Sequence, residues 1–125
     1  MNNIHNNNVV PKTLGPYSPS IVYDSLVFCS GQIGVDPITG TVVEGGIEAQ
    51  TKQVLLNLTA VLEQAGSSIE KVLKTTVFLK DMNDFAVVNT LYGNFFNIKF
   101  PARSCIEVSR LPKDVLVEIE LIAHI

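Results

Sequence analysis

The chain has 125 residues, a formal net charge of −3 and a hydrophobic fraction of 46%. The acidic balance argues against binding of nucleic acid through a basic patch, and no apolar run approaches the ~20 residues of a membrane-spanning helix. The length suits one domain, whose apolar residues exceed what its core can bury and favour an oligomer.

The N-terminal residues and the cysteines bear on order and on compartment. The first eight residues include five asparagines and no arginine, which is typical of a disordered polar tail and not of a targeting peptide. We therefore expect a single domain over residues 9–125. Cys29 and Cys105 lie among apolar residues in predicted strands, and buried reduced thiols are typical of the cytosol. A cytoplasmic protein is expected, with the mitochondrion as the alternative.

The first half of the chain predicts a loop, two strands and a helix. Two prolines and a glycine make Gly15–Pro19 a loop. Ile21–Tyr23 and Leu26–Ser30 read as strands of a hairpin. Apolar residues then recur with a period of 3.6 over Ile47–Ala65, and the glycine at position 66 predicts the end of this helix.

The second half predicts strand, helix, strand and strand. Leu73–Lys80 is rich in Thr, Val and Phe, as strands are. Asp81 is placed to cap a second helix, whose apolar stripe runs to Phe96. Strands follow over 103–108 and 115–123. The order β-β-α-β-α-β-β, with two helices on one face of a mixed sheet, predicts an α+β fold.

The last two strands are expected to pair as an antiparallel hairpin through Arg110–Lys113, because a proline there favours a turn. In this register Cys105 lies opposite Glu118 and Arg103 opposite Glu120, ~4.5–5.5 Å apart at Cβ. One face is then apolar, while the other carries a guanidinium, a thiol and carboxylates. Such a face predicts a site for a small anion.

The sheet face away from the helices is also expected to be covered. Phe78 and Leu116 fall on this face, which is less polar than a solvated sheet face normally is. We expect it to pack against copies of the same chain.

Six phrases, in this order, resemble one family. They are Gly15-Pro16-Tyr17-Ser18, Ser30-Gly31-Gln32-Ile33, Lys74-Thr75-Thr76-Val77-Phe78, Asn83-Asp84-Phe85, Phe100-Pro101-Ala102-Arg103-Ser104-Cys105 and Leu111-Pro112-Lys113-Asp114. Over about residues 10–123 the chain is similar to the Rid (reactive intermediate deaminase) family, also known as YjgF or L-PSP. The chain departs from the family pattern in its asparagine-rich start and in a shorter segment between Asn89 and Phe100.

The resemblance implies a chorismate-mutase-like protomer in a homotrimer, with the sheets lining a barrel and active sites between subunits. It implies hydrolysis of enamine and imine intermediates, such as 2-aminoacrylate and 2-iminobutanoate, to 2-keto acids and ammonia. These intermediates come from PLP-dependent dehydratases, so the resemblance implies a functional link to those enzymes. No cofactor is expected for the hydrolysis itself.

The family's site residues match seven positions here. Arg103 matches the arginine that binds the substrate carboxylate, and Glu118 matches the glutamate that positions the water. Residues that match the lining of the pocket are Tyr17, Ser30, Gly31, Asn89 and Cys105.

Each of these residues also has a plain structural reading. Arg103 suits a carboxylate because its planar fork binds both oxygens, yet it could pair with Glu120 instead. Glu118 could be an ordinary strand carboxylate. Cys105 has no histidine or paired cysteine near it in sequence, so it reads as a pocket wall and not as a nucleophile or metal ligand.

Three further residues, Gly31, Tyr17 and Asn89, have comparable alternatives. Gly31 either lets a ligand approach the backbone or ends a strand, and Tyr17 either flanks the site or packs its own loop. Asn89 lies outside the apolar stripe of its helix, where a solvated residue is the ordinary reading.

Two other functions stay open beside the deaminase. One is the single-stranded endoribonuclease that inhibits translation, an activity attached to the L-PSP name, against which the acidic charge and the lack of tryptophan count. The other is a trimer that binds keto acids without turnover.

Overall fold

The computed structural model of the protein describes residues 9–125, and the tail expected over residues 1–8 lies outside them. Helices and strands follow in the predicted order: β1 (Ser20–Tyr23), β2 (Leu26–Ile33), α1 (Gly46–Gln64), β3 (Val72–Leu79), α2 (Phe85–Phe95), β4 (Ala102–Glu107) and β5 (Val117–His124). Within residues 9–125, no helix combines the length and the apolarity needed to cross a membrane.

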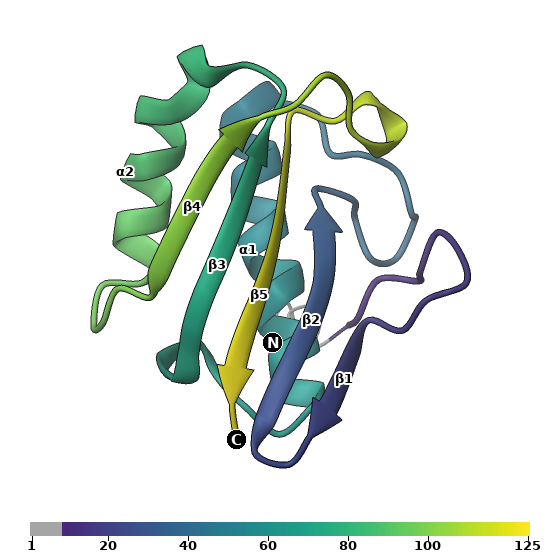
Figure 1. Cartoon of the computed structure of the whole chain (residues 1–125). Coiled ribbons are helices and arrows are strands. Elements are labelled where there is room, and N and C mark those ends of the chain that lie inside the picture. Colours follow the sequence, from purple (N-terminus) through teal and green to yellow (C-terminus); the bar gives the residue numbers. More distant parts are fainter. Residues whose placement is uncertain (1–8) are drawn as a thin grey trace, which may run out of the picture.

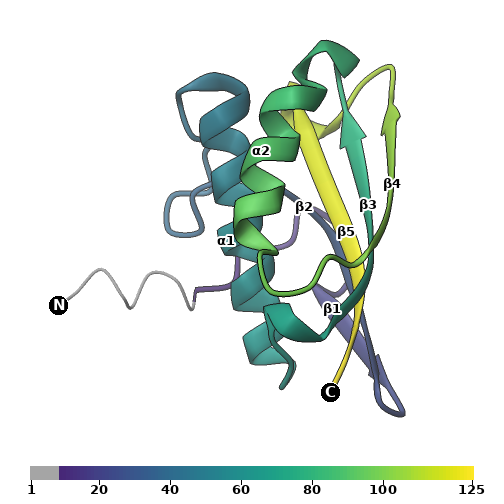
Figure 2. The ribbon, with the colours of Figure 1, turned by 90° about the vertical axis from the view of Figure 1, so that its left-hand side faces the viewer.

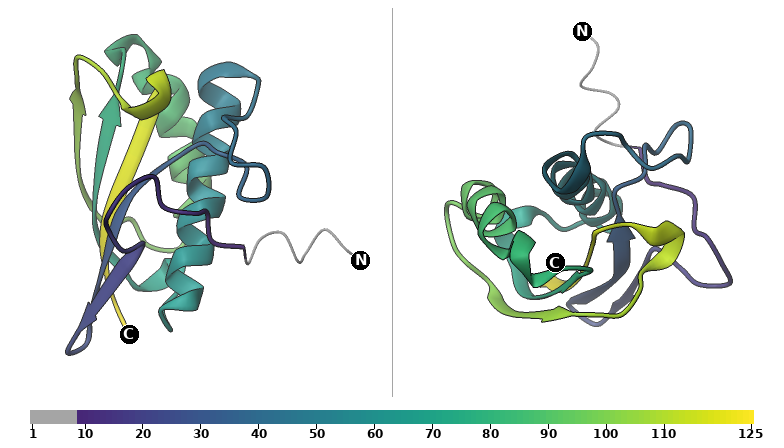
Figure 3. Two further views of the ribbon diagram at one scale, coloured as in Figure 1. Left: turned by 90° about the vertical axis from the view of Figure 1, so that its right-hand side faces the viewer. Right: turned by 90° about the horizontal axis from the view of Figure 1, so that it is seen from above.

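The strands form one mixed sheet in the order β1-β2-β5-β3-β4, in which only β3 and β4 are parallel. Both helices lie on the same face of the sheet (Figures 1 and 2). Seen from above, the sheet curves around the two α-helices and leaves its other face without an α-helix (Figure 3). The predicted α+β architecture is therefore confirmed.

The main core lies between the helices and the sheet. The stripe predicted for α1 supplies Val54, Leu58 and Val61, which are fully buried, and β5 supplies Val117 and Ile119 from the sheet. The helix ends where predicted, because the glycine after its last turn has a φ of 88°, in the left-handed region that stops helices.

The second helix begins later than predicted. Asp81 accepts a hydrogen bond from the backbone N–H of Asn83 at 2.9 Å, as a cap does. It caps a short 3-10 turn, Met82–Asp84, and α2 starts after this turn at Phe85.

The predicted hairpin of the last two strands is wrong. β3 lies between β4 and β5, pairing in parallel with the first and antiparallel with the second. The connection 108–116 instead passes over the end of β3: Val108 N–H donates to Leu79 O, and Lys80 N–H donates to Leu116 O. The physical reason is that a strand reached through a helix packed on the sheet returns parallel to the strand before it.

The face without helices is covered only at one end. There the chain's own loops bury Ile33, Val35, Leu111 and Val115, and Phe78 packs against this second cluster. Elsewhere on this face large apolar side chains are exposed, including Phe28 and Ile106, at 42% and 46%. Self-packing of the remaining surface stays a prediction.

Candidate functional site

The two residues expected to do the chemistry project to opposite faces of the sheet. Arg103 pairs across the ladder with Thr75, which is buried beneath the helices. Glu118 pairs with Phe78, on the face without helices. Since paired residues point to the same side of a sheet, Arg103 and Glu118 of one chain do not share a face. The prediction of a shared face is wrong because β3 separates the two strands.

The structure also removes the alternative partner of Arg103. Glu120 pairs with Thr76 and lies on the face opposite to the guanidinium. Within residues 9–125 the ion pairs are Lys52–Glu48 and Arg110–Asp114, and Arg103 takes part in neither.

Arg103 is instead held by α2, in what we call the Arg103 cluster: Arg103, Phe85, Asn89, Tyr92 and Cys105. Its Nη1 donates to Asn89 Oδ1 at 2.8 Å. Its guanidinium carbon lies 4.8 Å from the ring centroid of Tyr92 and 5.5 Å from that of Phe85, both within cation–π range. The spacing of these three α2 residues places them on one side of the helix.

The cluster brings together predicted and unpredicted residues. Asn89, for which solvation was the ordinary reading, contacts Arg103 directly. Sequence reasoning assigned Tyr92 and Phe85 only to the apolar stripe of the helix and missed their contact with the arginine. The available signal was their spacing of three and four residues from Asn89, which puts all three side by side.

The thiol of Cys105 fits a wall better than a nucleophile. Burial raises its pKa, and the nearby charge of Arg103 lowers it only in part. Burial raises the pKa of Cys29, in the main core, to about 12. Both thiols are therefore largely protonated at neutral pH. Within residues 9–125, no three His, Cys, Asp or Glu side chains gather as a metal site would require.

The second group of predicted residues, which we call the Glu118 cluster, comprises Glu118, Gly31, Ser30 and Tyr17. Gly31 lies against Glu118, Ser30 precedes Gly31 in β2, and Tyr17 lies in the loop before β1. β2 bulges here, because Ser30 and Gly31 together stand opposite Glu120 of β5, two residues from Glu118. A Cβ on Gly31 would lie 2.9 Å from the carboxyl carbon of Glu118, closer than real contacts allow. The glycine thus leaves room for the carboxyl group, a reason that sequence reasoning did not give.

Ser30 ties the Tyr17 loop to this cluster. Its Oγ donates to the carbonyl of Ser18 at 2.7 Å, and its backbone N–H donates to Pro19 O at 2.9 Å. Tyr17 is 45% exposed, and its hydroxyl accepts from the backbone N–H of Leu14 at 3.3 Å. The loop is anchored beside the bulge while the ring stays accessible.

The carboxyl group of Glu118 is electrostatically tuned. Its pKa is raised, first by burial and second by the charge of Glu120, its neighbour on the same face. A carboxylate with a raised pKa accepts a proton more readily near neutral pH, as a general base must.

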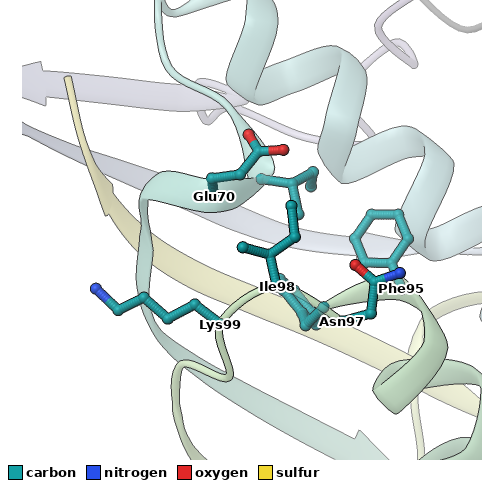
Figure 4. A pocket seen from close by; sticks show the side chains of 7 residues that line it. Glu70, Phe95, Asn97, Ile98 and Lys99 are labelled. Atoms are coloured by element: carbon teal, nitrogen blue, oxygen red, sulfur yellow. The ribbon is translucent and has the colours of Figure 1, made fainter.

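The segment that joins α2 to β4, for which the sequence predicts a shorter chain than the family pattern, has a small hollow beside it. Asn97, Ile98 and Lys99 lie beside Glu70 there (Figure 4). The hollow has a volume of about 30 Å³, room for water and not for a keto acid. None of the seven predicted site residues lines it.

Comparison with known proteins identifies one matching family and many similar proteins. Residues 7–125 match the family described as Endoribonuclease L-PSP. A RutC family protein of Synechocystis is 57% identical over 90% of this chain and 88% of its own. A 2-iminobutanoate/2-iminopropanoate deaminase of Salmonella typhimurium is 53% identical over 90% of both chains. The crystal structure of E. coli TdcF with bound serine superposes with a TM-score of 0.90 at 42% identity, over 94% of each chain.

Proposed function

Because the chain belongs to the Rid/YjgF/L-PSP family and has its chorismate-mutase-like α+β fold, we propose that it is a hydrolytic deaminase of reactive enamines and imines. Its substrates are 2-aminoacrylate and 2-iminobutanoate, and its products are 2-keto acids and ammonia. The observation that carries the proposal is the state of Arg103. Its fork is half-buried and held in place, yet no carboxylate of residues 9–125 forms an ion pair with it.

Arg103 binds the substrate carboxylate. One N–H of Nη1 is used by Asn89, and the other N–H groups of the guanidinium stay available for two parallel bonds to carboxylate oxygens. Phe85 and Tyr92 pack against the guanidinium, and a ligand would reach Arg103 at the N–H groups along the edge of the guanidinium plane. A 2-imino acid bound there has its C=N carbon one bond from the carboxylate, at a fixed distance from the arginine.

Glu118 activates the water. The carboxylate takes a proton from water as its oxygen adds to the iminium carbon, which gives a carbinolamine. The carboxyl group of Glu118 then gives this proton to the nitrogen. As the C–N bond breaks, the carboxylate takes up the proton of the carbinolamine hydroxyl, and ammonia and the 2-keto acid leave. An iminium is already electrophilic, so a general base worth about 10²–10⁴-fold suffices. An enamine first takes up a proton at carbon, which gives the iminium.

The complete site combines two copies of the chain. Arg103 and Glu118 of one protomer point to opposite faces, so the arginine of one copy is to meet the glutamate of a neighbour. The exposed Phe28 and Ile106 on the face without helices supply apolar surface for such an assembly. We propose the homotrimer that the family resemblance implies, with one site between each pair of subunits.

The test couples the purified protein to threonine dehydratase acting on threonine, with semicarbazide competing for the released imine. We expect the protein to accelerate 2-ketobutyrate formation, and Arg103→Ala to abolish the acceleration. Equal rates with and without the protein would contradict the proposal.

The endoribonuclease name of the family motivates one counter-test. Cleavage of labelled RNA that survives extensive purification and disappears in Arg103→Ala would support the RNase function instead. Binding of 2-ketobutyrate without any turnover would support the non-catalytic keto-acid trimer.

A further inference from the structure

Tyr92 of α2 has a feature that packing alone does not require. The residue is buried, with 5% of its surface exposed, and lies in the main core. Its hydroxyl lies 2.6 Å from Oγ1 of Thr75, which is fully buried in the centre of the sheet. A phenylalanine and a valine would fill the same space without a polar pair to satisfy.

The hydrogen bond between Tyr92 and Thr75 completes a set of contacts around Arg103. Thr75 stands directly opposite Arg103 on the neighbouring strand. Tyr92, bonded to Thr75, turns its ring toward the guanidinium of Arg103, whose carbon lies 4.8 Å from the ring centroid. Asn89, about one helical turn earlier, accepts from the same guanidinium. The three supports come from β3 and α2 and act on a side chain from β4.

This arrangement bears on binding because arginine is a flexible side chain. A free arginine loses rotamer entropy when it closes on a ligand, and a fork that is already ordered avoids most of this loss. The hydrogen bond between the Tyr92 hydroxyl and Thr75 fixes the orientation of the Tyr92 ring. The ring in turn limits the orientations that the guanidinium of Arg103 can adopt against it.

We infer that Tyr92, fixed by Thr75, is a positioning residue that orients Arg103 for the substrate carboxylate. The inference rests on the proposed function, since it deepens the role of the arginine there. Tyr92 acts on binding and stays remote from the C=N carbon. The inference thus predicts a change in KM and in the Kd of carboxylate ligands, with kcat nearly unchanged.

The experiment uses the full chain and 2-ketobutyrate as a stable ligand, with Kd measured by calorimetry and KM and kcat by the coupled assay. Tyr92→Leu removes the ring, and we expect Kd and KM to rise about 10-fold. Tyr92→Phe and Thr75→Val remove one hydroxyl each, and we expect rises of about 3-fold. In all three, kcat at saturation stays within about 2-fold of wild type, because the group at the reacting carbon is untouched.

Val61→Ala is the matched control, because Val61 is fully buried in the main core on α1, the other helix. It should lower the melting temperature and leave Kd unchanged. If Tyr92→Leu does not fold, the two conservative variants decide. Wild-type Kd in Tyr92→Phe and Thr75→Val, at lowered melting temperatures, overturns the inference.

Failure of the proposed function has a different signature. If the wild-type protein does not bind 2-ketobutyrate, or if Arg103→Ala binds it equally well, the carboxylate role of Arg103 is wrong. If Arg103→Ala loses binding while the Tyr92 and Thr75 variants keep it, only the positioning role is wrong.

Discussion

The Arg103 cluster and the Glu118 cluster are built by different means. Side chains hold the arginine: an amide and two aromatic rings of α2 contact it from one side. The backbone makes room for the glutamate, since a bulge in β2 and the glycine at its centre lie beneath the carboxyl group. The first arrangement suits a group that must be oriented, and the second suits a group that must stay close to water. Substitutions in the two clusters should therefore change different measured quantities.

The largest expected effect concerns the placement of the two clusters on opposite faces. Arg103→Ala should abolish the acceleration because it removes the group that binds the substrate carboxylate, and Glu118→Gln should lower turnover by about 10²–10⁴-fold because it removes the general base. Co-expressed as differently tagged copies, the two variants should regain roughly a quarter of wild-type activity, because random mixing joins an intact arginine to an intact glutamate in that share of sites. Activity of purified mixed assemblies is the measurement.

The control mixes Arg103→Ala with a chain that carries both Arg103→Ala and Glu118→Gln. Neither chain has an intact arginine, so no site in this mixture is complete. This mixture should stay inactive. A mixture of the two single variants that also stays inactive would show that the site is not shared between copies.

Two glycines of the β2 region separate chemistry from stability. Gly31→Ala displaces the carboxyl group of Glu118, a side-chain end that can move, so we expect kcat to fall about 10–100-fold with little change in melting temperature. Gly34→Ala meets the backbone of Gln50 in α1 at 2.9 Å, and a helix backbone cannot move as easily. Here we expect a loss of about 1–3 kcal/mol in unfolding free energy. Denaturant unfolding and the coupled assay measure the two effects, and equal stability losses would refute the distinction.

A smaller effect is expected from the amide in the Arg103 cluster. Asn89→Ala removes the hydrogen bond to Nη1 but leaves both rings in place. Because the aromatic contacts still orient the fork, KM should rise about 3–10-fold and kcat should hold. Steady-state kinetics of Asn89→Ala beside Thr90→Ala, on the next residue of α2, provides the comparison; a fall in kcat alone would contradict it.

The smallest effect is a shift in pH dependence. Glu118 must be ionised to accept a proton, and its raised pKa moves the acid limb of kcat above the pH expected for an ordinary glutamate. The charge of Glu120 is one cause of this rise, so Glu120→Gln should lower the pKa of Glu118 and move the limb to lower pH. A pH–rate profile that is unchanged in Glu120→Gln would show that burial alone sets the pKa.

What the sequence predicts well is local, and what it misses depends on distant pairing. The period of the stripe on α1 and the alternation along β5 are set by neighbours in the chain, and both are confirmed. The partner of β4 is set by the packing of α2, which brings β4 back parallel to β3. A proline-containing loop between two strands reads as a hairpin, although 108–116 is long enough to pass over a third strand.

The same limit applies to the site. Arg103, Asn89 and Cys105 do gather. Gly31 lies against Glu118, and Ser30 beside it is hydrogen-bonded to the loop that carries Tyr17. Their division into two groups depends on the face of the sheet on which each side chain lies. Pairing β4 with β5 instead of β3 puts Arg103 and Glu118 on the same face, which is wrong. The contact of Arg103 with Tyr92 crosses from helix to strand, so no local pattern reports it.

The contrast between the two thiols gives the natural chain a ready labelling handle. Cys29 is sealed in the core and hardly ionises at neutral pH, whereas Cys105 is only half-buried and lies two residues from Arg103. A small thiol reagent should therefore react faster at Cys105 than at Cys29, although burial raises the pKa of both thiols. A carboxylate bound at the neighbouring guanidinium should slow this reaction, so the rate of modification at Cys105 reports ligand binding.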